Sequence, residues 1–201
     1  IAFTFDGDVS DRGLSINPAN SAPVYASVQI ATRPELIPIE PENNGFGIHR
    51  NYQKVKLDGS LTEAENLEVG DLILVTLDVN LPNQRESYLA IDDPLPAIFE
   101  AVNPKFKSQA TQKVDRDRKI RRLYANHTEM QKDRVVFFAD SVFNAGDYTL
   151  QYLARVVAPG VVTAPPAKIE AMYEPQRFGL SGTEQIKAKA KTINTGEVAV
   201  R

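Results

Sequence analysis

The chain of 201 residues contains no cysteine. Disulfide bridges, thiolate catalysis and zinc sites built on Cys ligands are therefore excluded within it. Histidine is also scarce, and neither His49 nor His127 has a second ligand at metal-binding spacing. We therefore expect no metal site and no cofactor. The lack of Cys does not fix the compartment, since many extracytoplasmic proteins lack it too.

Long apolar runs are missing as well. No stretch of about 18 apolar residues is present, so the sequence predicts no transmembrane helix. The start carries no basic region followed by an apolar region, as a signal peptide would. The chain opens at Ile1 in an apparent strand and without Met, so we expect it to be part of a longer protein.

Charge of one sign does not dominate the chain. Its net charge of -3 gives no indication of a nucleic-acid partner or of an anionic membrane surface. The basic run at 113–122 holds six cations but no aromatic side chain on which bases could stack. We interpret the polar stretch 103–122 as a long loop or a solvated helix.

Alternation of apolar and polar side chains is the main structural signal. It predicts strands at 24–31, 48–57, 72–81, 87–92, 135–139 and 148–157. The most regular part, 133–166, is predicted to be a hairpin that turns at 144–147. We expect a linker at 33–47, one helical turn at 97–102, a loop or helical turn at 167–180, and a weakly structured tail or last strand after Ser181.

These elements predict an all-β fold. About eight to ten short strands at regular spacing, without a long amphipathic helix, are typical of an antiparallel β-sandwich. At most one short helix is expected. The chain is long enough to bury a substantial core.

Few residues offer catalytic chemistry. Asp92 and Asp93 are adjacent carboxylates, but neighbours on a strand point to opposite faces and cannot easily share a substrate. His127, Asp140 and Ser141 supply the residue types of a hydrolase triad without a Gly-x-Ser-x-Gly elbow. We therefore assign no catalytic residue and no small-molecule substrate. Asn126 begins an N-glycosylation pattern that arises often by chance.

Three sequence blocks together resemble one known family. The first runs from Tyr88 to Glu100 and contains YLAIDDPLPA, the second is DRVVFFADSVFNAGDYT at 133–149, and the third is PPAKIEAMY at 165–173. In this order they are similar to the last domain of bacterial alpha-2-macroglobulins. The resemblance covers about residues 67–180.

The resemblance implies a non-enzymatic, macroglobulin-like (immunoglobulin-like) β-sandwich at the C-terminus of a large extracytoplasmic protease trap. Residues 35–201 would form this sandwich, and residues 1–34 the closing strands of a preceding β domain. In such proteins a protease cuts a bait region, and a Cys-x-Glu-Gln thioester in a helical domain captures it. The implied partners are that thioester domain and, through the parent protein, target proteases.

The resemblance also implies an inter-domain contact at Met172 and Tyr173, in the loop that shields the thioester from water in bacterial relatives. The alternative is that Tyr173 only packs on its own sandwich edge. Glu184-Gln185 lacks the preceding Cys, so the thioester would lie elsewhere in the parent. The stretch 103–122 and the tail after Ser181 have no counterpart. A structural or adhesive cell-surface sandwich without protease chemistry is the competing interpretation.

Overall fold

The computed structural model describes residue 25, residues 38–102 and residues 121–191. The chain divides into two compact units after Leu36, and every described strand belongs to the second unit, Ile37–Arg201. The strand predicted at 24–31 and the domain predicted at 1–34 lie outside the described residues apart from residue 25. The domain division therefore stays a prediction.

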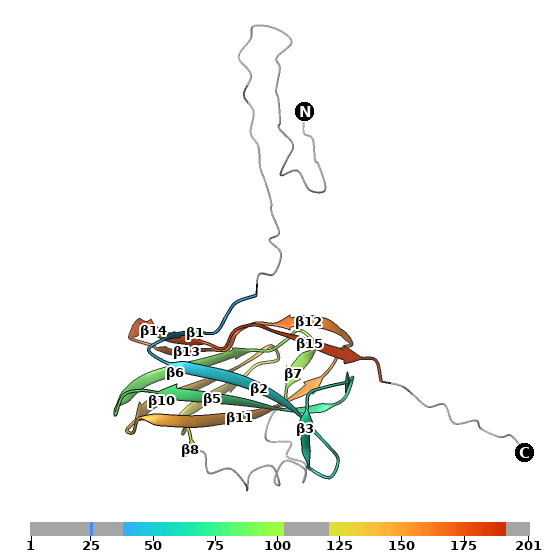
Figure 1. Cartoon of the computed structure of the whole chain (residues 1–201), viewed down its shortest axis with the longest axis horizontal. Helices are drawn as coiled ribbons and strands as arrows, with labels where there is room; N and C mark the ends of the chain where they lie inside the picture. The colour runs from blue at the N-terminus through green and yellow to red at the C-terminus, as the bar shows by residue number, and fades with distance from the viewer. Residues whose placement is uncertain (1–24, 26–37, 103–120, 192–201) are drawn as a thin grey trace, which may run out of the picture. The chain divides into compact units, whose positions relative to one another are not determined.

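The described residues of the second unit form two six-stranded sheets and one small sheet (Figure 1). Sheet A has the order β1 (Glu42–Asn44), β14 (Glu174–Leu180), β13 (Lys168–Ala171), β6 (Glu86–Pro94), β10 (Arg134–Val142) and β9 (His127–Met130). Sheet B has the order β3 (Leu61–Glu63), β2 (Gly47–Val55), β5 (Leu72–Leu81), β11 (Gly146–Val156) and β7 (Phe99–Ala101), with β8 (Arg121–Arg122) also paired to β11. Sheet C is formed by β12 (Gly160–Ala164), β15 (Glu184–Lys189) and β4 (Leu67–Glu68).

The predicted fold class is confirmed. All neighbouring strands are antiparallel except β8 with β11 and β4 with β15. The described residues contain no helix at all, and so none that is long and apolar enough to cross a membrane. Fifteen strands are present in this part of the chain, more than expected, because several of two to four residues are too short to show alternation.

The strand predicted at 72–81 is the centre of sheet B. It pairs with β2 on one side and with β11 on the other along its whole length. Its predicted inward residues are all buried: Ile73, Val75, Leu77, Val79 and Leu81. The inward face predicted for β11 is buried as well, from Tyr148 to Val156 in alternate positions. Period-two alternation therefore identified the core of this sheet correctly.

The prediction that 133–166 forms a hairpin is wrong, because its two strands do not pair with each other. Its two strands exist, but β10 pairs with β6 and β9 in sheet A, whereas β11 pairs with β5 and β7 in sheet B. The turn at 144–147 therefore carries the chain from one sheet to the other. Both strands have one apolar face, and these faces meet across the core, where the rings of Phe137 and Tyr152 lie 6.2 Å apart.

Three further predictions of irregular structure are wrong. The predicted helical turn at 97–102 contains β7, although Ile98 and Phe99 are buried as an apolar cap. The predicted loop at 167–180 is a β-hairpin of β13 and β14. The predicted linker at 33–47 lies outside the described residues up to residue 37, and its described part contains β1, which pairs with β14. The strands β7 and β1 pair with distant strands, and β13 pairs with the distant strand β6 as well as with its hairpin partner β14. The local sequence gives no indication of the distant pairing.

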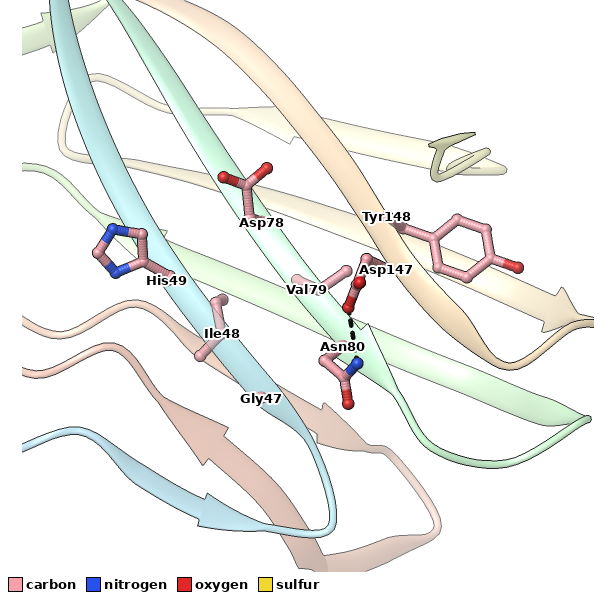
Figure 2. A pocket seen from close by; sticks show the side chains of 8 residues that line it. All are labelled: Gly47, Ile48, His49, Asp78, Val79, Asn80, Asp147 and Tyr148. Atoms are coloured by element: carbon pink, nitrogen blue, oxygen red, sulfur yellow. Dashed lines mark hydrogen bonds between the residues drawn. The ribbon is translucent and has the colours of Figure 1, made fainter. Parts of the chain in front are cut away.

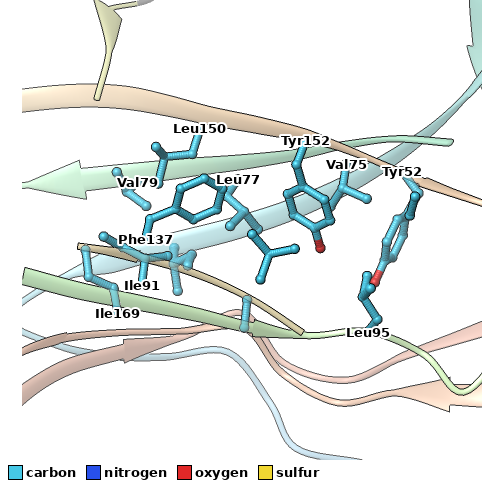
Figure 3. Packing of buried hydrophobic residues seen from close by; sticks show 14 of the residues in the cluster. Tyr52, Val75, Leu77, Val79, Ile91, Leu95, Phe137, Leu150, Tyr152 and Ile169 are labelled. Atoms are coloured by element: carbon cyan, nitrogen blue, oxygen red, sulfur yellow. The ribbon is translucent and has the colours of Figure 1, made fainter. Parts of the chain in front are cut away.

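The core lies between sheets A and B. Figure 3 shows Phe137, Ile91 and Ile169 of sheet A against side chains of sheet B. The sheet B residues that face them there are Val75, Leu77, Val79, Leu150 and Tyr152. Such interdigitation of two apolar inner faces is the main stabilising contribution in a β-sandwich.

A buried polar network crosses this core. Arg50 Nη1 of β2 donates to Asp93 Oδ1 of β6 at 2.6 Å, and Tyr152 Oη of β11 donates to Asp93 Oδ2 at 2.5 Å. Arg50 Nη2 also donates to the carbonyl oxygen of Pro165 at 2.7 Å, just before β13. Burial raises the pKa of Asp93, and the Arg50 guanidinium opposes that rise. Burial also raises the pKa of Tyr152, so its phenol remains a donor.

The adjacent carboxylates Asp92 and Asp93 should differ sharply in their effect on stability. Asp93 is fully buried, so Asp93→Asn leaves Arg50 without its counter-charge and is expected to cost about 3 kcal/mol or more. Asp92 pairs with Arg134 at a part-exposed site, so the control Asp92→Asn should cost at most about 1 kcal/mol. Urea unfolding of both variants tests this, and equal losses would contradict the assigned role of the network.

Candidate functional site

The hairpin of β13 and β14 ends in a two-residue turn at Met172 and Tyr173. Ala171 pairs with Glu174 across the turn, and the register shifts between Glu170 and Ala171. Bulges of this kind re-aim the end of a hairpin. Both turn side chains are exposed, Met172 by 47% and Tyr173 by 76%, while Ala171 beside them is buried. The two predicted contact residues are thus displayed together at the tip of a sheet A hairpin.

Tyr88 of β6 is the neighbour that supports this tip. Its carbonyl oxygen accepts a hydrogen bond from the Met172 N–H at 2.8 Å, which extends the β6–β13 ladder by one bond into the turn. Its ring meets the Tyr173 ring edge-to-face, with centroids 5.1 Å apart and planes at 87°. An aromatic pair of this geometry contributes about 0.5–1.5 kcal/mol.

The backbone of Tyr88 is strained. Its φ of 54° lies in the left-handed region, which L-residues other than Asn, Asp and Gly seldom adopt. A residue held there costs about 1–3 kcal/mol, and such residues occur preferentially at functional sites. The other non-glycine example in the described residues is Asn66, a residue type that tolerates this conformation. The strained backbone of Tyr88 therefore singles out this end of the sandwich as a candidate functional site.

An ion pair fixes the irregular part of β14, close to the tip of the same hairpin. Arg177 Nη2 of β14 donates to Glu86 Oε1 of β6 at 2.5 Å, and Asn83 Nδ2 donates to the same oxygen at 2.8 Å. The hydrogen bond to Glu86 raises the pKa of Arg177. The guanidinium also lies 4.7 Å from the centroid of the buried Phe46 ring. Backbone hydrogen bonds and side-chain contacts therefore both hold this hairpin against β6.

The side chains at the hairpin tip are suited to covering another group. A thioether and two phenol rings supply apolar area with polar ends, and they provide neither a nucleophile with an adjacent base nor a metal ligand set. Such a surface can lie against another apolar or reactive group and exclude water from it.

The other candidates from the sequence are not assembled into sites. Asp92 and Asp93 have different partners, Arg134 and Arg50, and their different burial confirms that they point to opposite faces. His127 stacks on Phe138, and no hydrogen bond joins it to Asp140 or Ser141 within the described residues. Asn126 is exposed, and its Oδ1 accepts the Asp140 N–H at 2.8 Å.

The remaining candidates from the sequence are metal-ligating side chains, the basic run at 113–122 and Glu184-Gln185. In residues 38–102 and 121–191 no group of three His, Asp or Glu side chains could hold a metal ion. Most of the basic run at 113–122 lies outside the described residues. Glu184 and Gln185 are exposed on β15, where they pair with β12. The last strand predicted after Ser181 is therefore present at Glu184–Lys189.

An open hollow of about 540 Å3 lies over β2, β5 and β11 (Figure 2). It is lined by Gly47, Ile48, His49, Asp78, Val79, Asn80, Asp147 and Tyr148. Its carboxylates are already engaged, since Asp147 accepts from Asn80 Nδ2 at 2.7 Å and Asp78 accepts from Thr149 Oγ1 at 2.7 Å. The two carboxylates therefore belong to ordinary cross-strand pairs on the outer face of sheet B.

The resemblance suggested Met172 and Tyr173 as contact residues, which stays a prediction, and sequence reasoning gave no indication of the residues that support them. Nothing in the sequence around Tyr88 indicates a left-handed backbone, because tyrosine does not favour that conformation. The pairing of Arg177 with Glu86 joins residues 91 apart. A single sequence therefore gives no indication of the Tyr88 backbone or of the Arg177–Glu86 pair.

Comparisons with known proteins give a consistent result. Residues 45–176 match the family model described as bacterial alpha-2-macroglobulin MG10 domain. An alpha-2-macroglobulin of Escherichia coli K12 is 30% identical over 186 residues, which are 88% of this chain and 11% of that protein. The chain therefore spans about a tenth of the length of this curated relative.

Two solved structures show the same similarity in three dimensions. One is Escherichia coli alpha-2-macroglobulin activated by porcine elastase, with a TM-score of 0.61 and 29% identity over 75% of this chain and 14% of that one. The other is Salmonella alpha-2-macroglobulin reacted with methylamine, with a TM-score of 0.57 and 27% identity over 75% of this chain and 10% of that one.

The exposure of Tyr173 leads to a stability prediction. Its ring contacts Tyr88 and is otherwise largely in solvent, so Tyr173→Ala should lower the free energy of unfolding by less than about 1 kcal/mol. The buried Tyr152 provides the control, because Tyr152→Ala should cost about 3–5 kcal/mol. Thermal and urea unfolding measure both. A large loss in Tyr173→Ala would show that this ring only supports its own sandwich edge.

Proposed function

This chain belongs to the family of bacterial alpha-2-macroglobulin MG10 domains, and on that premise we propose that its Met172–Tyr173 turn covers a thioester carried by another domain of its parent protein. The family consists of domains of protease-trapping proteins, inhibitors rather than catalysts. The chain is then the non-catalytic C-terminal domain of such a trap. Its partners are the thioester domain and, through the parent, the target proteases.

One observation carries the proposal. Two large side chains, Met172 and Tyr173, project from the tip of a hairpin whose remainder is fixed by β6. Exposed apolar side chains that cluster on a rigid support are typical of interaction sites. The alternative that Tyr173 packs on its own sandwich edge is disfavoured by its 76% exposure.

The physical requirement of a thioester fits this tip. A thioester is hydrolysed when water reaches its carbonyl carbon, so it needs an apolar cover until activation. A tyrosine suits a contact that must later be released, because its ring excludes water while its hydroxyl tolerates solvent. Methionine adapts its shape to an irregular neighbour. Together the two side chains form a cover that can separate without exposing a large apolar core.

The relatives support the chemistry of the parent. One has been solved as the form activated by porcine elastase and another after reaction with methylamine. Amines open a thioester by attacking its carbonyl carbon, which forms an amide and releases the thiol. This chain has no cysteine, so any thiol released in the parent comes from outside it.

Replacement of Tyr173 in the full-length parent tests the proposal. Tyr173→Ala should make methylamine react about tenfold faster, which corresponds to the loss of about 1.4 kcal/mol of contact free energy. The thiol that appears as the thioester opens is followed with a chromogenic disulfide reagent. A matching loss of protease-trapping capacity on storage is expected, because water then reaches the thioester as well.

Phe143 offers a matched control for this experiment. Its ring is 66% exposed and contacts Arg85, so Phe143→Ala removes a comparable exposed aromatic from another turn. It should leave the methylamine rate unchanged. A parent that releases no thiol with methylamine and does not retard proteases would overturn the proposal and favour a structural or adhesive surface domain.

We also propose an extracytoplasmic location, periplasmic or anchored at the cell envelope. The support is family membership, since an inhibitor of foreign proteases acts where they arrive. Fusion of the full-length gene product to alkaline phosphatase, which folds only outside the cytoplasm, should give an active enzyme. An inactive fusion that is present at normal abundance would count against this location.

A further inference from the structure

Tyr88 has a geometry that its position in β6 does not require. The strand keeps a single register with β10 on both sides of it, from the Leu89–Ala139 pair to the Ser87–Ser141 pair. Between these pairs Tyr88 and Asp140 form no bridge. The Asp140 N–H faces the β9 side and donates to Asn126 Oδ1, and Tyr88 adopts its left-handed φ of 54°. The departure is thus confined to one residue pair within an otherwise regular ladder.

The altered backbone interrupts the alternation of β6 before Leu89. Regular alternation in β6 places Leu89, Ile91 and Asp93 inside. At the start of the strand two consecutive residues, Ser87 and Tyr88, are exposed. Tyr88 lies on the outer face that regular alternation already gives it, and next to the hairpin tip its ring meets the Tyr173 ring edge-to-face.

Tyr88 holds the tip at two points. The backbone bond from the Met172 N–H fixes the start of the turn, and the ring contact fixes the side chain that follows. Tyr88 is the one aromatic neighbour of Tyr173 in the part of the chain that the structure describes. Without that ring, the Tyr173 side chain would be free to sample other rotamers, since most of it lies in solvent.

We propose that Tyr88 is a positioning residue, whose left-handed backbone and ring hold Tyr173 in the orientation that covers the thioester. The inference rests on the proposed function of Tyr173 and extends it to a residue that does not itself touch the thioester. It also gives a physical reason for a strained tyrosine at this point. Strain at one residue is retained where it pre-organises a contact made by another.

Substitution by glycine separates function from stability at this position. Glycine adopts positive φ without strain, so Tyr88→Gly should fold and should not lower the midpoint of thermal unfolding. The same change deletes the ring that orients Tyr173. In the full-length parent it should therefore speed thiol release by methylamine about two- to tenfold, the range set by the loss of one aromatic pair. A merely structural residue would not show a faster reaction with undiminished stability.

Two further variants complete the experiment. Tyr88→Phe keeps the ring and its edge-to-face contact and should react at the rate of the unchanged protein. The double variant Tyr88→Gly/Tyr173→Ala should react no faster than Tyr173→Ala alone, because Tyr88 acts through Tyr173. Additive rates would overturn the inference.

The outcomes distinguish this inference from the proposed function. A faster reaction in Tyr173→Ala with an unchanged rate in Tyr88→Gly refutes the positioning role alone. Unchanged rates in both variants refute the covering role of Tyr173 and, with it, the role of Tyr88. A parent without methylamine-sensitive thiol release refutes both as well.

Discussion

The buried ion pair between Arg50 and Asp93 is the constraint on which the rest of the sandwich depends. Two charges inside an apolar core are tolerated only if their geometry is satisfied, and here each sheet supplies one of them. The pair fixes β2 against β6, Tyr152 ties β11 to the same carboxylate, and the Pro165 carbonyl is held just before β13 begins. Sliding either sheet by one residue would leave a buried charge unpartnered.

This arrangement separates the stable part of the domain from the part that we assign to function. The network lies in the core near the start of β13, whereas Met172 and Tyr173 follow the end of that strand. Pairing of β13 with both β6 and β14 connects the two regions through backbone hydrogen bonds. The exposed turn can therefore contact another domain, and later leave it, without disturbing the core.

Sequence alone was most informative where one residue pattern determines burial. The alternation of β5 and β11 identified their inward faces, and the order of three short blocks identified the family. It failed where pairing partners lie far apart: β10 and β11 were expected to form a hairpin but belong to opposite sheets, because alternation defines an apolar face and not the strand beside it. The resemblance suggested Met172 and Tyr173 as contact residues, which no observation yet tests, whereas Tyr88 is apparent only from its backbone angle and its neighbours in space.

The place of the Tyr173 ring in the parent protein before activation decides whether it covers the thioester. The most direct measurement is a high-resolution structure of the full-length parent with its thioester intact. In that structure the Tyr173 ring should lie in van der Waals contact with the thioester, within about 4 Å, and Tyr88 should keep its edge-to-face contact with Tyr173. A thioester covered by other residues, with Tyr173 in solvent, would contradict this prediction.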